Sequence, residues 1–168
     1  SREGRPIGAG TERTVSEDAD HPDRVLKRDH RLEEIRPRVV RSRFYMGKLL
    51  HLLLPENIPQ IHRSTQRLAE MTMEKKTLDP QHVYISQLSL PPEYWPEGYT
   101  PPNNMELERF IQMRHADDRV QALKQRFGEI GIEIYDRSAL NFAFDEQGQS
   151  VYVDTIDAWW ECTARDEA

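Results

Sequence analysis

A proline-rich stretch in the middle of the chain, residues 77–104, constrains the fold more than any other feature. Its centre reads LPPEYWPEGYTPPN, and closely spaced prolines remove backbone donors and disfavour both helix interiors and central strands. A long segment of this kind is typical of a functional loop or a linker. We therefore expect an N-terminal part at 1–76, a proline-rich linker or loop at 77–104, and a C-terminal part at 105–168.

The size and composition of the chain are those of one folded unit. Its 168 residues are enough to bury a core as one domain or as one compact two-lobed unit. The net charge of −6 gives no electrostatic reason to expect nucleic acid or an anionic membrane as a partner, and no apolar run is long enough to span a bilayer. Cys162 is the only cysteine, which excludes an internal disulfide and favours a reducing, cytoplasmic setting.

Short strands and one long helix are predicted for the N-terminal part. Residues 5–28 carry glycine-bearing turns between short strands, and the sequence RVLK forms the last of these strands. Apolar residues recur at helical spacing over 31–54, where Pro37 suits the first turn of the main segment. Two further strands are predicted at 58–61 and 68–73.

Two helices and a β-hairpin are predicted for the C-terminal part. Apolar spacing indicates helices at 105–113 and 117–127, with Gly128 as the C-cap of the second. The sequence NFAFDEQGQSVYVD has an alternating arm on each side of a turn at 145–148, which is the pattern of a hairpin. Before it, the alternating IEIY predicts a strand that leads to Asp136.

Three oxygen-bearing side chains flank the predicted hairpin. Asp136 ends the preceding strand, Asn141 begins the first arm, and Asp154 ends the second arm. A strand out and a strand back of similar length return to the same edge, so we expect these three side chains to converge. Carboxylate and amide oxygens are the ligands that Mg²⁺ takes beside nucleotide phosphates. The pattern therefore predicts a Mg²⁺–nucleotide site at this edge.

The same segments resemble motifs of the protein-kinase-like superfamily. YDRSALN is similar to its catalytic loop, in which an Asp precedes an Asn by five positions, as Asp136 precedes Asn141 here. GAGTERTV resembles the glycine-rich loop, and RVLK resembles the strand that carries the phosphate-contacting lysine, here Lys27. HLLLPENIPQIH resembles the segment that joins the small-lobe helix to the next strand. These motifs follow one another along the chain in the order of the superfamily.

The resemblance implies an α+β, minimal kinase-like two-lobed fold, with an antiparallel N-lobe sheet and one main helix, joined to a truncated C-lobe. It implies ATP and Mg²⁺ as cofactors, with phosphoryl transfer to a hydroxyl of a small molecule or a protein. By resemblance, Asp136 is the catalytic residue, and Asn141 and Asp154 are the metal ligands. The residues that the resemblance implies in nucleotide binding are Gly8, Gly10, Val15 and Lys27.

Several residues depart from the superfamily pattern. Arg13 replaces the third glycine of the loop, and the His-Arg pair before the catalytic Asp is replaced by Ile-Tyr. The helix has no Glu near residues 46–47, where the partner of the lysine usually lies, and only 14 residues follow Asp154. With these departures, the motifs resemble those of small-molecule and atypical kinases more than those of protein kinases. They also open a second hypothesis, a non-catalytic, pseudokinase-like module that binds a nucleotide or a protein.

The motifs also have simpler interpretations. The three oxygen-bearing side chains are of types that favour turns, the early glycines are common turn residues, and Lys27 is then a surface lysine of an edge strand. The aromatic side chains within 90–102 predict a surface for a protein partner, or else side chains that pack the loop onto the core. A third hypothesis is an unrelated α+β interaction domain.

Overall fold

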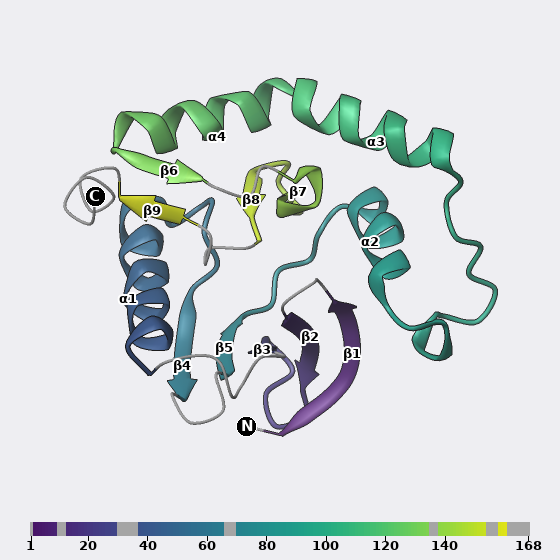
Figure 1. Cartoon of the computed structure of the whole chain (residues 1–168), viewed down its shortest axis with the longest axis horizontal. Helices are drawn as coiled ribbons and strands as arrows, with labels where there is room; N and C mark the ends of the chain where they lie inside the picture. Colours follow the sequence, from purple (N-terminus) through teal and green to yellow (C-terminus); the bar gives the residue numbers. More distant parts are fainter. Residues whose placement is uncertain are drawn as a thin grey trace.

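The chain has an α+β structure in which a five-stranded antiparallel sheet lies at one end and two long helices lie at the other (Figure 1). The computed structural model describes residues 2–9, 13–29, 37–65, 70–134, 138–153 and 158–160. The α+β class expected from the sequence is confirmed. Within those ranges, no helix has both the length and the apolar character needed to cross a membrane.

The five-stranded sheet belongs to the N-terminal part of the chain. Its strands follow the spatial order β1-β2-β3-β5-β4, and every neighbouring pair is antiparallel. Their bounds are β1 (Glu3–Ala9), β2 (Arg13–Asp18), β3 (Arg24–Asp29), β4 (Ile61–Thr65) and β5 (Glu70–Glu74). Helix α1 (Pro37–Leu53) separates β3 from β4 in sequence and begins at the predicted proline. Phe44 of this helix packs against an apolar cluster that includes Met71 and Met73 of β5.

One of the two predicted later strands is shifted along the chain. The strand expected at 58–61 begins only at Ile61, because Asn57 and Ile58 form a turn whose backbone N–H groups donate to the carbonyl of Leu54. The side chain of Ile58 is fully buried in the main core. An apolar residue of this turn therefore gave a strand-like pattern without being in a strand.

Gly4 of β1 lies against the backbone of β2. A Cβ atom at this position would lie 2.9 Å from the backbone oxygen of Glu17, closer than such atoms approach in real proteins. At Gly8, by contrast, an added Cβ would lie 3.9 Å from the Cβ of Val15, which is an ordinary contact. The two glycines therefore differ in how strictly the strand pairing requires them.

We expect Gly4→Ala to lower the free energy of unfolding by about 1–3 kcal/mol, because the strand backbones must separate to admit the methyl group. Gly8→Ala is the matched control in the same strand and should change it by less than about 0.5 kcal/mol. Urea unfolding followed by circular dichroism measures both. Equal losses in the two variants would contradict the steric explanation.

The remaining elements belong to the proline-rich stretch and the C-terminal part. Helices α3 and α4 confirm the two predicted helices and begin with side-chain caps from Asn103 and Asp117. Gly128, however, lies inside α4 and is not its C-cap; Gly131, with φ 75°, takes the left-handed turn after the helix. The bounds are α2 (Pro80–Ser86), η1 (Gln87–Ser89), η2 (Pro92–Tyr94), α3 (Asn104–Ala116), α4 (Asp118–Glu129), β6 (Ile132–Ile134), η3 (Ala139–Asn141), β7 (Phe142–Phe144), β8 (Ser150–Tyr152) and β9 (Ala158–Trp160).

The predicted hairpin is present as β7 and β8. Phe142 pairs with Tyr152 and Phe144 pairs with Ser150. The turn lies where the sequence places it: the Asp145 carboxylate accepts two backbone N–H bonds of 2.9 Å, and Gly148 has φ 76°. A second two-stranded sheet joins β6 to β9.

A single apolar core connects the two halves of the chain. It combines Leu50 of α1, and Leu54 and Ile58 of the turn after α1, with residues of α4, β6 and the hairpin. The buried members are Leu50, Leu54, Ile58, Val120, Leu123, Phe127, Ile132, Phe142, Phe144 and Tyr152. The turn after α1 adds polar contacts: the Asn57 amide donates to Ser150 O at 2.8 Å and accepts from Arg126 at 3.0 Å. Helix α1 and the turn after it are thereby packed against α4 and the hairpin.

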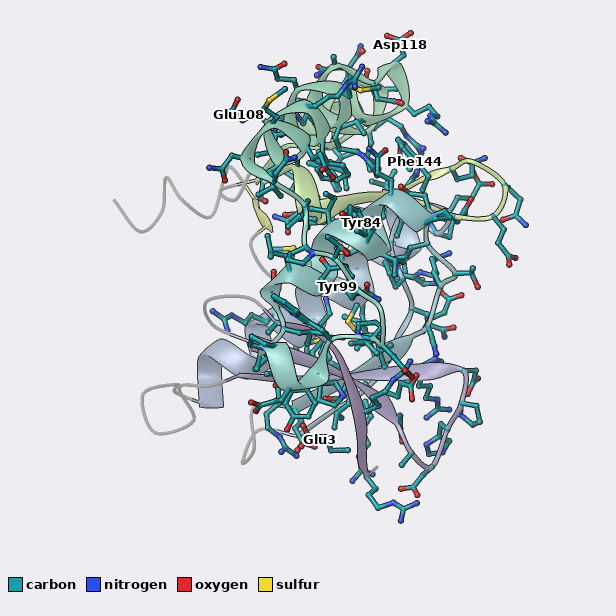
Figure 2. All side chains as sticks on the ribbon, turned by 90° about the vertical axis from the view of Figure 1, so that its right-hand side faces the viewer. Glu3, Tyr84, Tyr99, Glu108, Asp118 and Phe144 are labelled. Atoms are coloured by element: carbon teal, nitrogen blue, oxygen red, sulfur yellow. The ribbon has the colours of Figure 1, made fainter. Side chains whose placement is uncertain are left out.

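The proline-rich stretch contains short helical elements that the sequence analysis did not predict. Its aromatic side chains pack on one another (Figure 2): the rings of Tyr84 and Tyr99 have centroids 5.6 Å apart, and those of Trp95 and Tyr99 are 5.3 Å apart. The Tyr99 hydroxyl also donates to Tyr84 O at 2.8 Å. Tyr94, whose side chain is 48% exposed, stands outside this stack.

Candidate functional site

A row of predicted site residues crosses the first three strands of the sheet. Gly8 of β1 pairs with Val15 of β2, and Val15 pairs with Lys27 of β3. Val25, two residues before Lys27 and on the same face, packs against the methionine cluster of β5. The lysine therefore lies at the end of an apolar strip on the face of the sheet that α1 packs against.

Lys27 reaches from the sheet to the hairpin. Its Nζ donates a hydrogen bond to the backbone carbonyl of Val153, the residue that follows β8. The backbone N–H of Val153 in turn donates to the carbonyl of Asn141 at 2.9 Å. Asn141 is only 8% exposed. Two of the predicted site residues, Lys27 and Asn141, thus meet through one residue, although they are far apart in the sequence.

Three predicted site residues lie outside the described residues: Gly10, Asp136 and Asp154. Two of them are close in the sequence to residues that the structure describes. Asp154 directly follows the Val153 that Lys27 contacts, and Asp136 precedes Ser138, which caps the short helix η3 that ends at Asn141. Four of the seven predicted positions are described. Gly8, Val15 and Lys27 lie in one row across three strands, and Asn141 is connected to Lys27 through hydrogen bonds to Val153.

The described acidic and imidazole side chains do not form a metal site by themselves. Within the described ranges, no three His, Cys, Asp or Glu residues gather closely enough to hold an ion. Asn141 is the predicted metal ligand that the structure describes.

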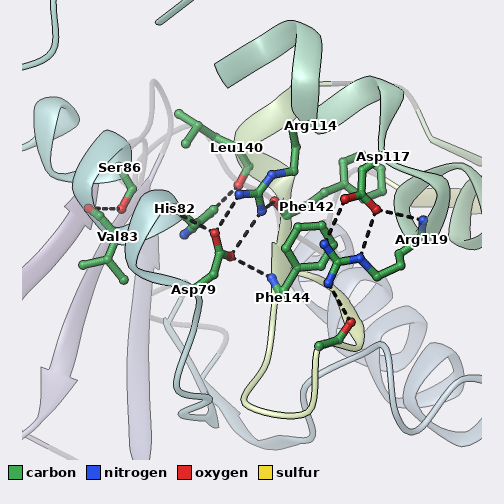
Figure 3. A network of polar contacts seen from close by, with 11 residues as sticks. Asp79, His82, Val83, Ser86, Arg114, Asp117, Arg119, Leu140, Phe142 and Phe144 are labelled. Carbon is green, nitrogen blue, oxygen red and sulfur yellow. Dashed lines mark hydrogen bonds and ion pairs between the residues drawn. The ribbon is translucent and has the colours of Figure 1, made fainter. Parts of the chain in front are cut away.

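A second group of polar residues lies beside the hairpin and was missed in the sequence (Figure 3). Asp79 precedes α2, and its carboxylate is paired with the guanidinium of Arg114 on α3 through bonds of 2.7 and 3.2 Å. The same carboxylate accepts the backbone N–H of His82 at 3.1 Å and that of Phe144 at 2.8 Å. Arg114 also donates to Phe142 O at 3.0 Å.

Arg114 is buried, with 4% of its surface exposed. Its guanidinium carbon lies 4.8 Å from the centroid of Phe110 and 4.4 Å from that of Phe144, so the charge is held by two ring faces as well as by Asp79. Burial alone would raise the pKa of Asp79, but hydrogen bonds from Arg114 and from the Phe144 N–H outweigh it and lower the pKa. Asp79 is therefore ionised at neutral pH.

His82 completes this group. Its Nε2 lies 2.8 Å from Leu140 O, and since a carbonyl can only accept, Nε2 carries the proton. The ring is 6% exposed, and Nδ1 has no hydrogen-bond partner within the part of the chain that the structure describes. Burial is the main cause that lowers the pKa of His82; Arg114 acts in the same direction and Asp79 opposes it. The imidazole is neutral in the folded protein.

The neutral His82 makes stability depend on pH. In the unfolded chain the imidazole takes up a proton as the pH falls below about 6.5, whereas in the folded protein it resists protonation. Stability should therefore be complete above this value and decrease as the pH falls toward the lower, folded pKa.

The thermal unfolding midpoint of the wild type should fall between about pH 8 and about pH 5, and less so for His82→Gln, whose amide can donate to Leu140 O without titrating. His62 and His115, whose pKa values are also lowered first by burial, contribute equally to both proteins. The difference between the two melting curves thus isolates His82. Parallel curves would contradict the prediction.

A local signal for this group was present in the sequence. Asp79 followed by Pro80 combines a preferred N-cap with the residue best suited to the first helical position, and the structure begins α2 there. The partners Arg114 and Leu140 are distant in sequence, and no local pattern indicates them. Neither a protein-family model nor a curated protein sequence matches the chain.

Proposed function

We propose that the protein is an ATP- and Mg²⁺-dependent phosphotransferase of minimal kinase-like fold, with its nucleotide site between β1–β3 and the β7–β8 hairpin. The observation that carries this proposal is the hydrogen bond from Lys27 Nζ to Val153 O. It directs a cationic side chain of the sheet to the residue before Asp154, which is where a lysine must lie to share phosphates with a metal held by that carboxylate.

The arrangement of the elements also supports the proposal. A five-stranded antiparallel sheet with one main helix, α1, is the small-lobe architecture that the sequence resemblance implies. A linker, two helices and a hairpin then follow in the implied order. The row of Gly8, Val15 and Lys27 lies on adjacent strands, as a glycine-rich loop and its lysine strand require.

Each residue has a defined role in this proposal. Gly8 and Gly10 would cover the phosphates, and Val15 would contact the base or sugar. Lys27 would neutralise the phosphate charge that develops during transfer. Asp136 would orient the acceptor hydroxyl, on a small molecule or a protein. Asn141 and Asp154 would hold Mg²⁺, which supplies electrostatic stabilisation of the phosphates.

Ligand-induced stabilisation tests the proposal directly. A ligand that binds only the folded protein stabilises it by about 2.7 kcal/mol at 100 times its dissociation constant, which raises the melting temperature of a chain of this size by roughly 5–10 °C. We expect this shift with ATP and Mg²⁺ together and a smaller one with ATP and EDTA. No shift at millimolar ATP with Mg²⁺ would reject a nucleotide site.

The second candidate is a non-catalytic nucleotide-binding module. One observation favours it: α1, from Pro37 to Leu53, contains no Asp or Glu, so this helix supplies no carboxylate to orient Lys27. The discriminating result is a melting-temperature shift with Mg²⁺-ATP but no transfer of phosphate to any acceptor and no hydrolysis of ATP. Measurable turnover that depends on Asp136 and Asp154 would favour the enzyme.

A further inference from the structure

Strand β7 has two edges, and in the part of the chain that the structure describes only one of them is paired with another strand. On the β8 side, Ala143 faces Val151, and the carbonyl of Asn141 accepts the N–H of Val153. The opposite edge presents the backbone groups of alternate residues, because successive peptide groups of a strand point to opposite sides. Unpaired backbone groups at a buried edge need partners, so the other edge must be satisfied in some other way.

Two side chains and one backbone group bond to that opposite edge, and a third side chain bonds to η3 just before the strand. The bonds to β7 are Arg114 Nη1 to Phe142 O at 3.0 Å, Phe144 N to Asp79 Oδ1 at 2.8 Å, and Asp79 N to Phe144 O at 2.9 Å; the bond to η3 is His82 Nε2 to Leu140 O at 2.8 Å. We name Asp79, His82 and Arg114 the edge clamp. Figure 3 shows all three converging on the segment from Leu140 to Phe144, Asp79 and His82 from the start of α2 and Arg114 from α3.

The residues that the edge clamp holds lie on both sides of Asn141 in the sequence. Clamped residues 140 and 142 lie immediately before and after Asn141, whereas the Asn141 carbonyl points to the β8 edge, where Lys27 also bonds to Val153. A shift of the clamp would therefore rotate the backbone of Asn141 relative to Val153 and Lys27.

The clamp is also built to hold one position. His82 and Arg114 are 6% and 4% exposed, and the Asp79–Arg114 pair is bidentate. His82 has one donor bond and a buried second nitrogen without a partner, so rotating the ring would lose its bond without gaining another. The connection after β5 leads directly to Asp79, which joins the sheet to β7, the strand that begins immediately after Asn141.

We propose that the edge clamp consists of positioning residues that set the geometry of Asn141, and through it the contribution of Mg²⁺ to nucleotide binding. This inference rests on the proposed function, since it names the residues that hold Asn141 in place within the proposed nucleotide site. Partners that orient metal ligands from behind typically change metal affinity or activity by about 10- to 100-fold when removed. A core residue without this role changes only the stability of the fold.

The experiment compares wild type, His82→Gln and His82→Leu by isothermal titration calorimetry with ATP plus Mg²⁺ and with ATP plus EDTA. The quantity measured is the gain in ATP affinity that Mg²⁺ provides. His82→Leu, which cannot donate to Leu140 O, should reduce this gain by about 10-fold or more with unchanged affinity in EDTA, and His82→Gln should restore it. A lower melting temperature in His82→Leu with an unchanged Mg²⁺ gain would overturn the proposal.

A second readout separates this inference from the proposed function. If the wild type binds no ATP, the proposed function fails, and amide hydrogen exchange then tests the clamp alone. The N–H groups of Asn141 and Phe142 donate to Ser138 O and Ala139 O, so both report on the segment that the clamp holds. At equal pH they should exchange faster in His82→Leu than in His82→Gln. Equal exchange in the two variants would overturn the positioning role.

Discussion

Arg114→Met is expected to lower the free energy of unfolding by about 3 kcal/mol, since removing one partner of a buried ion pair leaves the other charge uncompensated. For a chain of this length, this corresponds to a melting temperature lower by roughly 6–12 °C. Asp79 would keep only its backbone donors from His82 and Phe144, and Phe142 O would lose its bond. Chemical denaturation of the purified variant measures the loss.

Arg119 provides a matched control for this prediction. It also pairs with an aspartate, Asp117, at 2.9 Å and also lies over the ring of Phe144, at 3.5 Å, but its side chain is 49% exposed. Arg119→Met should therefore cost less than about 1 kcal/mol. The double variant Asp79→Ala/Arg114→Met should be less destabilised than the sum of its single variants, because it removes the stranded charge. Similar losses for Arg114→Met and Arg119→Met would contradict the importance of burial.

Lys27→Met is expected to reduce phosphoryl transfer by about 10²- to 10³-fold, the usual consequence of removing one charged group that stabilises the transition state. The lysine lies where its Nζ bonds to Val153 O, beside the proposed Asp154 ligand. Its loss should cost the fold only about 1.5–3 kcal/mol, the contribution of a hydrogen bond to a charged group. Transfer of labelled phosphate from ATP, measured at saturating Mg²⁺, is the assay.

Lys48→Met is the control for this second prediction. Lys48 is exposed on α1, where its ammonium lies 5.1 Å from the ring centroid of Phe44. Its activity should equal that of the wild type. If Lys27→Met retained wild-type transfer under the same conditions, Lys27 would have no part in catalysis and the nucleotide site would need another cation.

Elements with local signals were predicted well from the sequence. Pro37 at the start of α1 and the Asp145–Gly148 turn of the hairpin act through the conformation of a few neighbouring residues, so a single sequence reveals them. Gly128 and Gly131 show the limit of such signals. Both glycines could end α4, and only the position of Phe127 in the core and the chain direction after it decide between them.

The edge clamp could not be predicted because its contacts are long-range. Asp79 and Phe144 are 65 residues apart, and His82 and Leu140 are 58 apart. The many prolines and aromatic residues after Asp79 indicated an irregular loop, so residues 77–104 were predicted as a linker despite the Asp-Pro helix start. For the candidate site, the resemblance of the motifs was enough to predict Lys27 and Asn141 as site residues; their connection through Val153 was visible only in three dimensions.

The apolar core that Leu50, Leu54 and Ile58 share with α4 and the hairpin has a consequence for how the chain can be divided. A split within the proline-rich stretch would give two polypeptides, each with half of one interior exposed to water. Neither piece would be an autonomous building block, and each would become soluble only by capturing the other. The two parts must then be kept together, and a substitution on one side of this core must be compensated by one on the other side.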